Sequence, residues 1–136
     1  MTTGSEERGQ AYLALRGGHG VRYESASFFL QGVDGSTVVV AAGEIDVATS
    51  PALREALLVA AELSNRVVVD LSAVTFLDST GLGVLMGGFK NVSAHGSMCL
   101  VGPTGMVAKV LRVTRLDEVI PVRADLDAAL SASNDT

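Results

Sequence analysis

The chain has 136 residues, of which 48% are hydrophobic and 18% are charged, and its net charge is -5. This length suits one domain with its own hydrophobic core, and the acidic balance without a basic cluster argues against nucleic acid as a partner. The only cysteine, Cys99, excludes a disulfide framework and is interpreted as a buried small side chain in a reducing, cytoplasmic compartment. The longest purely apolar run, residues 56–61, is too short to cross a bilayer, so no membrane span is expected.

The first 21 residues contain "MTTGSEERGQ" and "RGGHG" and show no sustained hydrophobic period. This composition predicts a flexible N-terminal extension, in which Tyr12, Leu13 and Leu15 could still form a short docked segment. We expect residues 22–130 to form the folded domain and residues 131–136 to be a flexible tail.

From Ser27 the pattern changes, because two apolar runs flank Asp34-Gly35, which is a strong signal for a β-hairpin. The segment "TSPALREALLVAAELS" then has helical spacing, with Ser50 as the predicted N-cap and Pro51 at the first helical position. The short β-branched run "RVVVDL", residues 66–71, is typical of a strand that helices cover.

A second helix is expected from about Thr80, since apolar residues recur along one of its faces: Leu82, Leu85, Met86, Phe89 and Val92. Later segments predict a strand over 97–102, a helix over 104–114, a strand over 118–122 and a helix over 124–133. The order β-β-α-β-α-β-α-β-α predicts a single α/β domain with a mixed, mostly parallel sheet and an N-terminal hairpin.

Polar clusters follow two of the parallel strands, in the predicted loops 43–49 and 73–80, and should meet at one edge of the sheet. In the second loop, Asp78, Ser79 and Thr80 precede an apolar helix. Side-chain oxygens there could simply cap the helix. Alternatively, Ser79 could be a modified hydroxyl, since a phosphate would face the N-H groups and positive dipole end of the helix. The residues alone leave both readings open.

Two kinds of enzyme fit the sequence poorly. The spacing of Gly81, Gly83 and Gly87 departs from the dinucleotide-binding fingerprint, and these glycines do not follow their strand at once. A serine hydrolase would need a nucleophile elbow, but Ser79 does not lie in a G-x-S-x-G sequence.

Metal-dependent and acid-base chemistry also find little support. Asp46 and Asp78 could form an acid-base pair or bind Mg²⁺, but no further ligand set accompanies them. His19 and His95 have no neighbouring residues that would make them catalytic. We therefore predict no catalytic residue, no metal site and no cofactor.

The segment "VVVDLSAVTFLDSTGLGVLMGGFK" closely resembles the signature of STAS-domain anti-sigma factor antagonists of the SpoIIAA and RsbV type, D-L-x-x-[VL]-x-[FY]-[LMI]-D-S-[ST]-G-L-G. The segment "GEIDVATSPALREAL" is similar to the G-E-[LI]-D segment and first helix of that family. The segment "LVGPTGMVAKVLRVTRLDEVIPV" is similar to its C-terminal strand, helix and strand. The resemblance covers roughly Ser27 to Leu130.

The resemblance implies that Ser79 is phosphorylated by a cognate anti-sigma factor that is also an ATP-dependent serine kinase. It implies that Asp46 supports recognition by that kinase. The remaining predicted partner-binding residues are Asp78, Thr80, Gly81, Leu82 and Gly83.

In the implied cycle, the unphosphorylated chain binds the anti-sigma factor and frees the sigma factor, phosphorylation releases the chain, and a PP2C-type phosphatase restores it. The chain would be a monomer or weak dimer. The N-terminal extension and Gly87-Gly88 depart from the family pattern, and these glycines could permit close helix packing. Two alternatives remain: an accessory subunit of a membrane transporter or signalling assembly, and a nucleotide-binding enzyme.

Overall fold

The computed structural model describes residues 10–15, 18–23 and 25–134. In chain order the elements are β1 (Gln10–Leu15), β2 (Gly18–Tyr23), β3 (Ala26–Val33), β4 (Ser36–Ile45), α2 (Ser50–Leu63), β5 (Arg66–Leu77), α3 (Ser79–Ser93), β6 (Ser97–Val101), α4 (Gly105–Val113), a 3₁₀ turn (Leu116–Glu118), β7 (Val122–Arg123) and α5 (Leu126–Asn134). From β3 onward this order confirms the predicted alternation of strands and helices.

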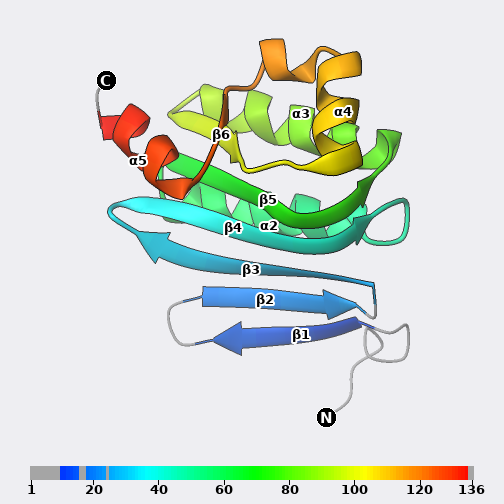
Figure 1. Cartoon of the computed structure of the whole chain (residues 1–136). Coiled ribbons are helices and arrows are strands. Elements are labelled where there is room, and N and C mark those ends of the chain that lie inside the picture. The colour runs from blue at the N-terminus through cyan, green and yellow to red at the C-terminus, as the bar shows by residue number, and fades with distance from the viewer. Residues whose placement is uncertain (1–9, 16–17, 24, 135–136) are drawn as a thin grey trace.

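The strands form one sheet in the order of the sequence, from β1 at one edge to β7 at the other (Figure 1). In the part from β3 to β7, the β3–β4 pair is antiparallel and the other three pairs are parallel, as the sequence predicted. The β3–β4 turn has positive φ angles of 50° at Asp34 and 80° at Gly35, which explains the Asp-Gly signal. All the parallel strands therefore end at the same edge.

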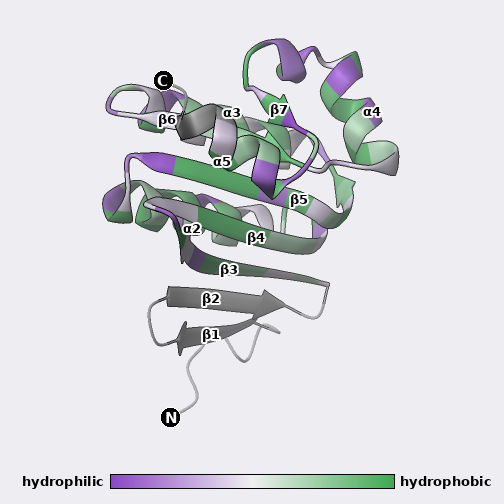
Figure 2. Cartoon of the chain, turned by 60° about the vertical axis from the view of Figure 1, so that its left-hand side comes forward, coloured by the Kyte–Doolittle hydropathy of each residue, from purple (hydrophilic) through white to green (hydrophobic). Residues whose placement is uncertain are grey.

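The hydrophobic core lies on both faces of this sheet. The main cluster joins alternate strand residues such as Val67 and Val69 to Leu53 of α2, Leu85 of α3 and Val107 of α4. A smaller cluster on the opposite face, around Val68 and Cys99, is covered by α5, and Figure 2 shows the apolar colouring along β4 and β5 between these helices. Burial raises the pKa of the Cys99 thiol, which fits its interpretation as a buried side chain.

The N-terminal region differs from the flexible extension predicted over residues 1–21. Strands β1 and β2 pair with Gln10 opposite Tyr23 and Leu15 opposite Gly18, and β2 continues antiparallel along β3. This hairpin adds two strands to the sheet (Figure 1), because β2 pairs with the edge that β3 would otherwise present. The predicted boundary at residue 22 falls inside β2, and residues 1–9 lie outside the described part.

Strand β5 is longer than predicted, running to Leu77 instead of ending before Ser72. Its register against β4 shifts next to Asp70, whose carboxylate Oδ1 accepts hydrogen bonds from the Ser72 amide at 2.9 Å and the Ser72 hydroxyl at 2.7 Å. These two polar residues satisfy each other at an irregularity in the strand, after which Val74 and Leu77 return to the core. The predicted loop 73–80 is therefore reduced to the residues after Leu77.

The C-terminal region also departs from prediction in two details. The last strand pairs only Val122 and Arg123 with β6, later than the predicted range 118–122, because residues 116–118 form a 3₁₀ turn that buries Leu116. Helix α5 continues to Asn134, so it includes most of the predicted tail, and residues 135–136 lie outside the described part. Among the helices of the described ranges, none combines the length and hydropathy that crossing a bilayer requires.

Candidate functional site

The two polar segments singled out in the sequence lie side by side at the carboxyl edge of the parallel strands. The register sets Ile45 of β4 opposite Leu77 of β5, and the Asp78 amide donates a hydrogen bond to the Ile45 carbonyl oxygen at 3.2 Å. Asp46 follows the last residue of β4 and Asp78 follows the last residue of β5, so the two aspartates begin adjacent connections. The prediction that both clusters meet at one end of the sheet is confirmed.

Asp78 is the N-cap of α3. Its Oδ1 accepts hydrogen bonds from the amide of Thr80 at 2.9 Å and the amide of Gly81 at 3.1 Å, and the Thr80 hydroxyl donates to the same oxygen. These bonds satisfy amides of the first helical turn that have no partner within the helix. Because Asp78 takes the cap, α3 begins at Ser79, one residue before the predicted start.

Ser79 is the first residue of α3 and is exposed to solvent. Within the described residues, the structure records no hydrogen bond from its hydroxyl. The sequence left two hypotheses open, a helix cap and a modified hydroxyl. The cap is supplied by Asp78, so the Ser79 hydroxyl is left available for modification.

Asp46 folds its own loop rather than reaching across to β5. Its Oδ1 accepts hydrogen bonds from the amides of Ala48 at 3.0 Å and Thr49 at 3.1 Å. The Thr49 side chain is buried, accepts from the Asp46 amide at 2.9 Å and donates to the Glu44 carbonyl oxygen at 2.7 Å. Thr49 is also the N-cap position of α2, so the helix starts at Ser50, one residue earlier than predicted.

Gly81 sets how closely the first turn of α3 approaches the sheet. A Cβ atom built at Gly81 would lie 2.5 Å from Leu77 Cδ1 and 2.8 Å from Ile45 Cγ2, well inside van der Waals contact. The missing side chain therefore lets the helix start directly over the ends of β4 and β5. Gly81 is buried between α3 and the sheet, so it fixes the position of Ser79 and is not part of the exposed surface.

The glycine of the "GEID" segment has a similar role on the first loop. Gly43 has a φ of 88°, and a Cβ there would lie 2.0 Å from the Ser25 carbonyl oxygen. The next amide, of Glu44, donates to that same oxygen at 2.9 Å. Only glycine fits this turn of the strand, which leads the chain into the loop at Asp46.

The last two residues predicted to bind a partner differ from each other. Leu82 is half-buried and packs against the main core, so only part of its side chain is available. Gly83 is exposed, and a Cβ built there would meet nothing within 4 Å. Five of the six predicted partner-binding residues thus lie at or near the surface around Ser79, and the sixth, Gly81, is buried beneath it.

Comparison with known proteins places these features in a family. The family model described as "STAS domain" matches residues 28–129, which is most of the chain. The chain belongs to the STAS domain family. The match begins within β3, so β1 and β2 lie outside it.

Individual relatives agree with this assignment. The anti-sigma-B factor antagonist of Bacillus subtilis (strain 168) is 39% identical over 84 residues, which are 61% of this chain and 77% of that protein. The crystal structure of an anti-sigma factor antagonist from Mycobacterium paratuberculosis has 35% identity and a TM-score of 0.75, covering 82% of this chain and 96% of its own. Unphosphorylated SpoIIAA shares the fold, with a TM-score of 0.68 at 22% identity, covering 80% of this chain and 97% of its own.

Two exposed apolar side chains of the STAS domain also lie at the edge that carries Ser79, and the sequence prediction missed them. Val47, next to Asp46, is 71% exposed, and Phe76, two residues before Asp78, is 39% exposed. Other exposed apolar side chains, such as Leu63 and Val113, lie elsewhere on the chain, so these two do not by themselves mark a binding surface. The signal available in the sequence was a single valine in the polar loop "DVATS".

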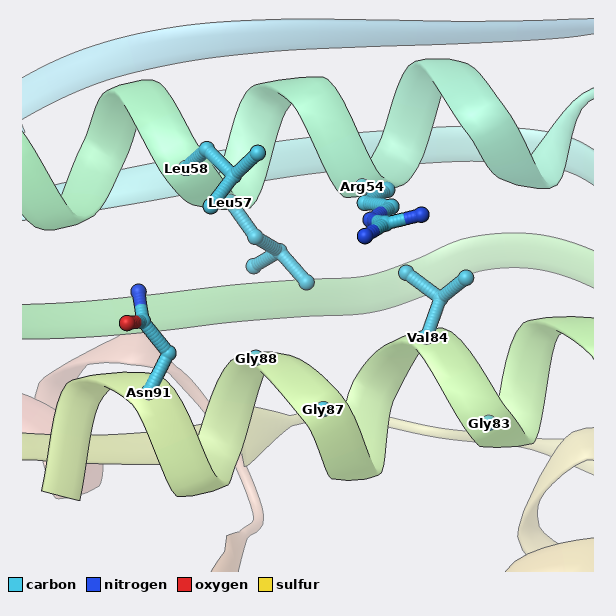
Figure 3. A pocket seen from close by; sticks show the side chains of 8 residues that line it. All are labelled: Arg54, Leu57, Leu58, Gly83, Val84, Gly87, Gly88 and Asn91. Atoms are coloured by element: carbon cyan, nitrogen blue, oxygen red, sulfur yellow. The ribbon is translucent and has the colours of Figure 1, made fainter.

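A groove of about 370 Å³ runs between α2 and α3, starting one turn after Ser79 (Figure 3). Leu57 of α2 points toward α3, and a Cβ at Gly88 would lie 2.7 Å from Leu57 Cδ1. The prediction that Gly87-Gly88 permits close helix packing is confirmed for Gly88. Gly87 instead borders open space, with nothing within 4 Å of a built Cβ.

The carboxylates at the site are committed to local hydrogen bonds. Oδ1 of Asp46 and Oδ1 of Asp78 each accept from two backbone amides of their own loops. In the part of the chain that the structure describes, no group of three His, Cys, Asp or Glu side chains is arranged to hold a metal ion. The geometry therefore assigns these two carboxylates to holding loops in shape.

The pKa of Asp78 is lowered from the ordinary carboxyl value of 3.8, mainly by the hydrogen bond from the Thr80 hydroxyl and further by the Gly81 and Thr80 amides. A lowered pKa in the folded state stabilises the fold above the pKa of the unfolded state. That stabilisation is lost as the pH falls through the folded value.

Replacing Thr80 by valine removes the hydroxyl but keeps the side-chain shape. We expect the pKa of Asp78 to rise toward 3.8, because its largest stabilising contact is lost. A ¹³C NMR titration of the Asp78 carboxyl carbon in both proteins measures this directly. An unchanged or lower pKa in Thr80→Val would contradict the hydrogen bond as its cause.

Proposed function

We propose that this STAS domain is an anti-sigma factor antagonist that phosphorylation of Ser79 switches off. In its unphosphorylated form it binds an anti-sigma factor that has serine-kinase activity, and thereby releases the sigma factor held by that protein. The names of the relatives from Bacillus subtilis and Mycobacterium paratuberculosis support this role. The role is regulatory, and a PP2C-type phosphatase would complete the cycle.

The observation that carries the proposal is the setting of Ser79. Its hydroxyl is exposed and has no hydrogen-bond partner in the described part of the chain, at the first position of a helix whose cap is already supplied by Asp78. A kinase can therefore reach the oxygen without unfolding the helix or breaking the cap. Asp46 and the exposed Val47 lie in the adjacent loop at the same edge of the sheet, where a partner that reaches Ser79 can contact them.

Phosphorylation would act on the surface rather than on the fold. The Thr80 and Gly81 amides, which could have received a phosphate, already donate to Asp78. A phosphate on Ser79 would therefore extend outward beside the Asp78 carboxylate and add about -1.5 to -2 charges to the docking surface. Burying that charge in an interface without a basic partner is costly, so the bound state is disfavoured.

The predicted partner-binding residues take different parts in this proposal. Thr80 and Gly83 continue the exposed surface along α3 from Ser79, and Leu82 adds only the part of its side chain that the core leaves uncovered. Asp46 and Asp78 hold the two loops in the shape that the partner recognises. Gly81 keeps α3 seated on the sheet.

Capture of partners from a lysate of the source organism tests the proposal. The unmodified chain should retain an ATP-dependent protein kinase, and Ser79→Asp should not. Ser93→Asp is the matched control, because it places the same charge at an exposed position at the other end of α3 and should still capture the kinase. Capture of a membrane transporter in place of a kinase would favour the alternative role as an accessory subunit.

Asp46→Ala is expected to slow phosphorylation by about tenfold, equivalent to about 1.4 kcal/mol in the barrier, because the loop beside Ser79 loses its anchor. Unlike a pure recognition residue, Asp46 also supports the fold through its bonds to the Ala48 and Thr49 amides. We therefore expect a loss of about 1 kcal/mol in the free energy of unfolding. Phosphorylation kinetics and urea titration measure the two effects.

Asp46→Asn is the matched control, since its amide oxygen can still accept the two backbone hydrogen bonds. It should keep most of the stability that Asp46→Ala loses. If Asp46→Ala is phosphorylated at the wild-type rate, Asp46 has no part in recognition.

A further inference from the structure

The first turn of α3 carries two neighbouring hydroxyls, of which only that of Thr80 has a hydrogen-bond partner among the described residues. Ser79 and Thr80 are both exposed, so a kinase that docks at this edge meets both. The hydroxyl of Thr80 donates to Asp78 Oδ1, whereas the structure records no hydrogen bond for the Ser79 hydroxyl within its described residues. Exposure alone therefore does not distinguish the two sites, but hydrogen bonding does.

The bond from Thr80 is of a strong kind, because its acceptor is an ionised carboxylate. The same Oδ1 atom also accepts from the amides of Thr80 at 2.9 Å and Gly81 at 3.1 Å. A carboxylate that receives three donors is a weak base, which agrees with the lowered pKa of Asp78. Asp78 therefore fixes the Thr80 hydroxyl against the cap and is poorly suited to remove its proton.

A kinase acting on Thr80 would first have to break this bond and turn the side chain away from the cap. Ser79 carries no such restraint. Because Asp78 is the residue that caps the helix, the restraint on Thr80 exists whenever α3 is formed.

Building on the proposed function, we infer that Asp78 is a specificity residue, which directs phosphorylation to Ser79 by holding the hydroxyl of Thr80. In the transfer, the Ser79 oxygen forms a bond to the γ-phosphorus of ATP supplied by the kinase. The bond from that phosphorus to the bridging oxygen of ADP breaks, and the hydroxyl proton passes to a base of the kinase or to water. Thr80 is thus a latent second acceptor that the cap keeps silent.

The test uses the full chain, ATP and the kinase captured with the unmodified protein, followed by mass-spectrometric mapping of the phosphorylated residue. Wild type should carry phosphate on Ser79 and hardly any on Thr80. In Asp78→Asn the acceptor is neutral but can still cap the helix, so the Thr80 share should rise roughly tenfold. Asp70→Asn is the matched control, because Asp70 holds the Ser72 amide and hydroxyl in the same way and should leave the mapping unchanged.

A second measurement does not depend on the kinase. In NMR spectra of the free chain, the Thr80 hydroxyl proton should exchange with water at least about tenfold more slowly than that of Ser79, and Asp78→Asn should remove this difference. Equal exchange in wild type, or phosphate confined to Ser79 in a folded Asp78→Asn protein, would overturn the specificity role while leaving the proposed function intact. If wild type accepts no phosphate at either residue, the proposed function itself fails, and the specificity role fails with it.

Discussion

Ser79→Asp is expected to weaken binding of the anti-sigma factor by roughly 100-fold, or about 2.7 kcal/mol, relative to the unmodified chain. The reason is that a charge placed at the centre of the docking surface loses its water when the partner binds and finds an acidic neighbour in Asp78. Titration calorimetry with the purified anti-sigma factor measures the difference. Ser79→Ala, which adds no charge, should bind about as tightly as wild type.

Ser79→Asp should leave the fold intact, since Ser79 is exposed and the cap is provided by Asp78. Backbone NMR shifts should therefore change mainly in residues 43–49 and 78–84. Widespread shifts in the core strands, over 67–69 and 98–101, would show that the switch works through a change of fold. Tight binding by Ser79→Asp would contradict the explanation that added charge at Ser79 weakens binding.

Gly81→Ala is expected to lower the free energy of unfolding by about 1–3 kcal/mol, the usual cost of forcing an extra methyl group into a packed site. The added Cβ would lie 2.5 Å from Leu77 Cδ1 and 2.8 Å from Ile45 Cγ2, so α3 would have to lift away from the sheet. Urea denaturation measures the loss. Phosphorylation should also slow, because Ser79 moves with the first turn.

Gly87→Ala is the matched control on the same helix. Its Cβ would meet nothing within 4 Å, and alanine is favoured over glycine inside a helix, so a gain of about 0.5–1 kcal/mol is expected. If both alanine variants are equally stable, the close contact at Gly81 does not determine the position of the helix.

Much of the fold could be predicted because local patterns and tertiary packing agree. Asp34-Gly35 adopts the positive φ angles that its sequence favours, and the apolar faces of α2 and α3 pack on the core. The location of the site at the carboxyl edge of the sheet could be predicted from strand order alone, because parallel strands end at the same edge. Ser79 itself was identified by resemblance to a family, since helix capping was a sufficient explanation of the residues around it.

Other features depend on contacts that a sequence does not display. Asp70 and Ser72 were expected to end a strand, but they bond to each other and β5 continues past them. Asp46 was predicted to support recognition by the kinase, and its carboxylate also holds the Ala48 and Thr49 amides. In each case a polar side chain bonds to a residue two or three positions along the chain. The local sequence therefore has the polar composition of a loop or a binding site.

The most direct test of the central claim is the intact mass of the chain after incubation with the captured kinase and ATP. Wild type should gain the mass of one phosphate, and Ser79→Ala should gain none while still binding the kinase. A phosphate that persists on Ser79→Ala, or a wild-type chain that binds the kinase and stays unmodified, would contradict the assignment of Ser79 as the switch.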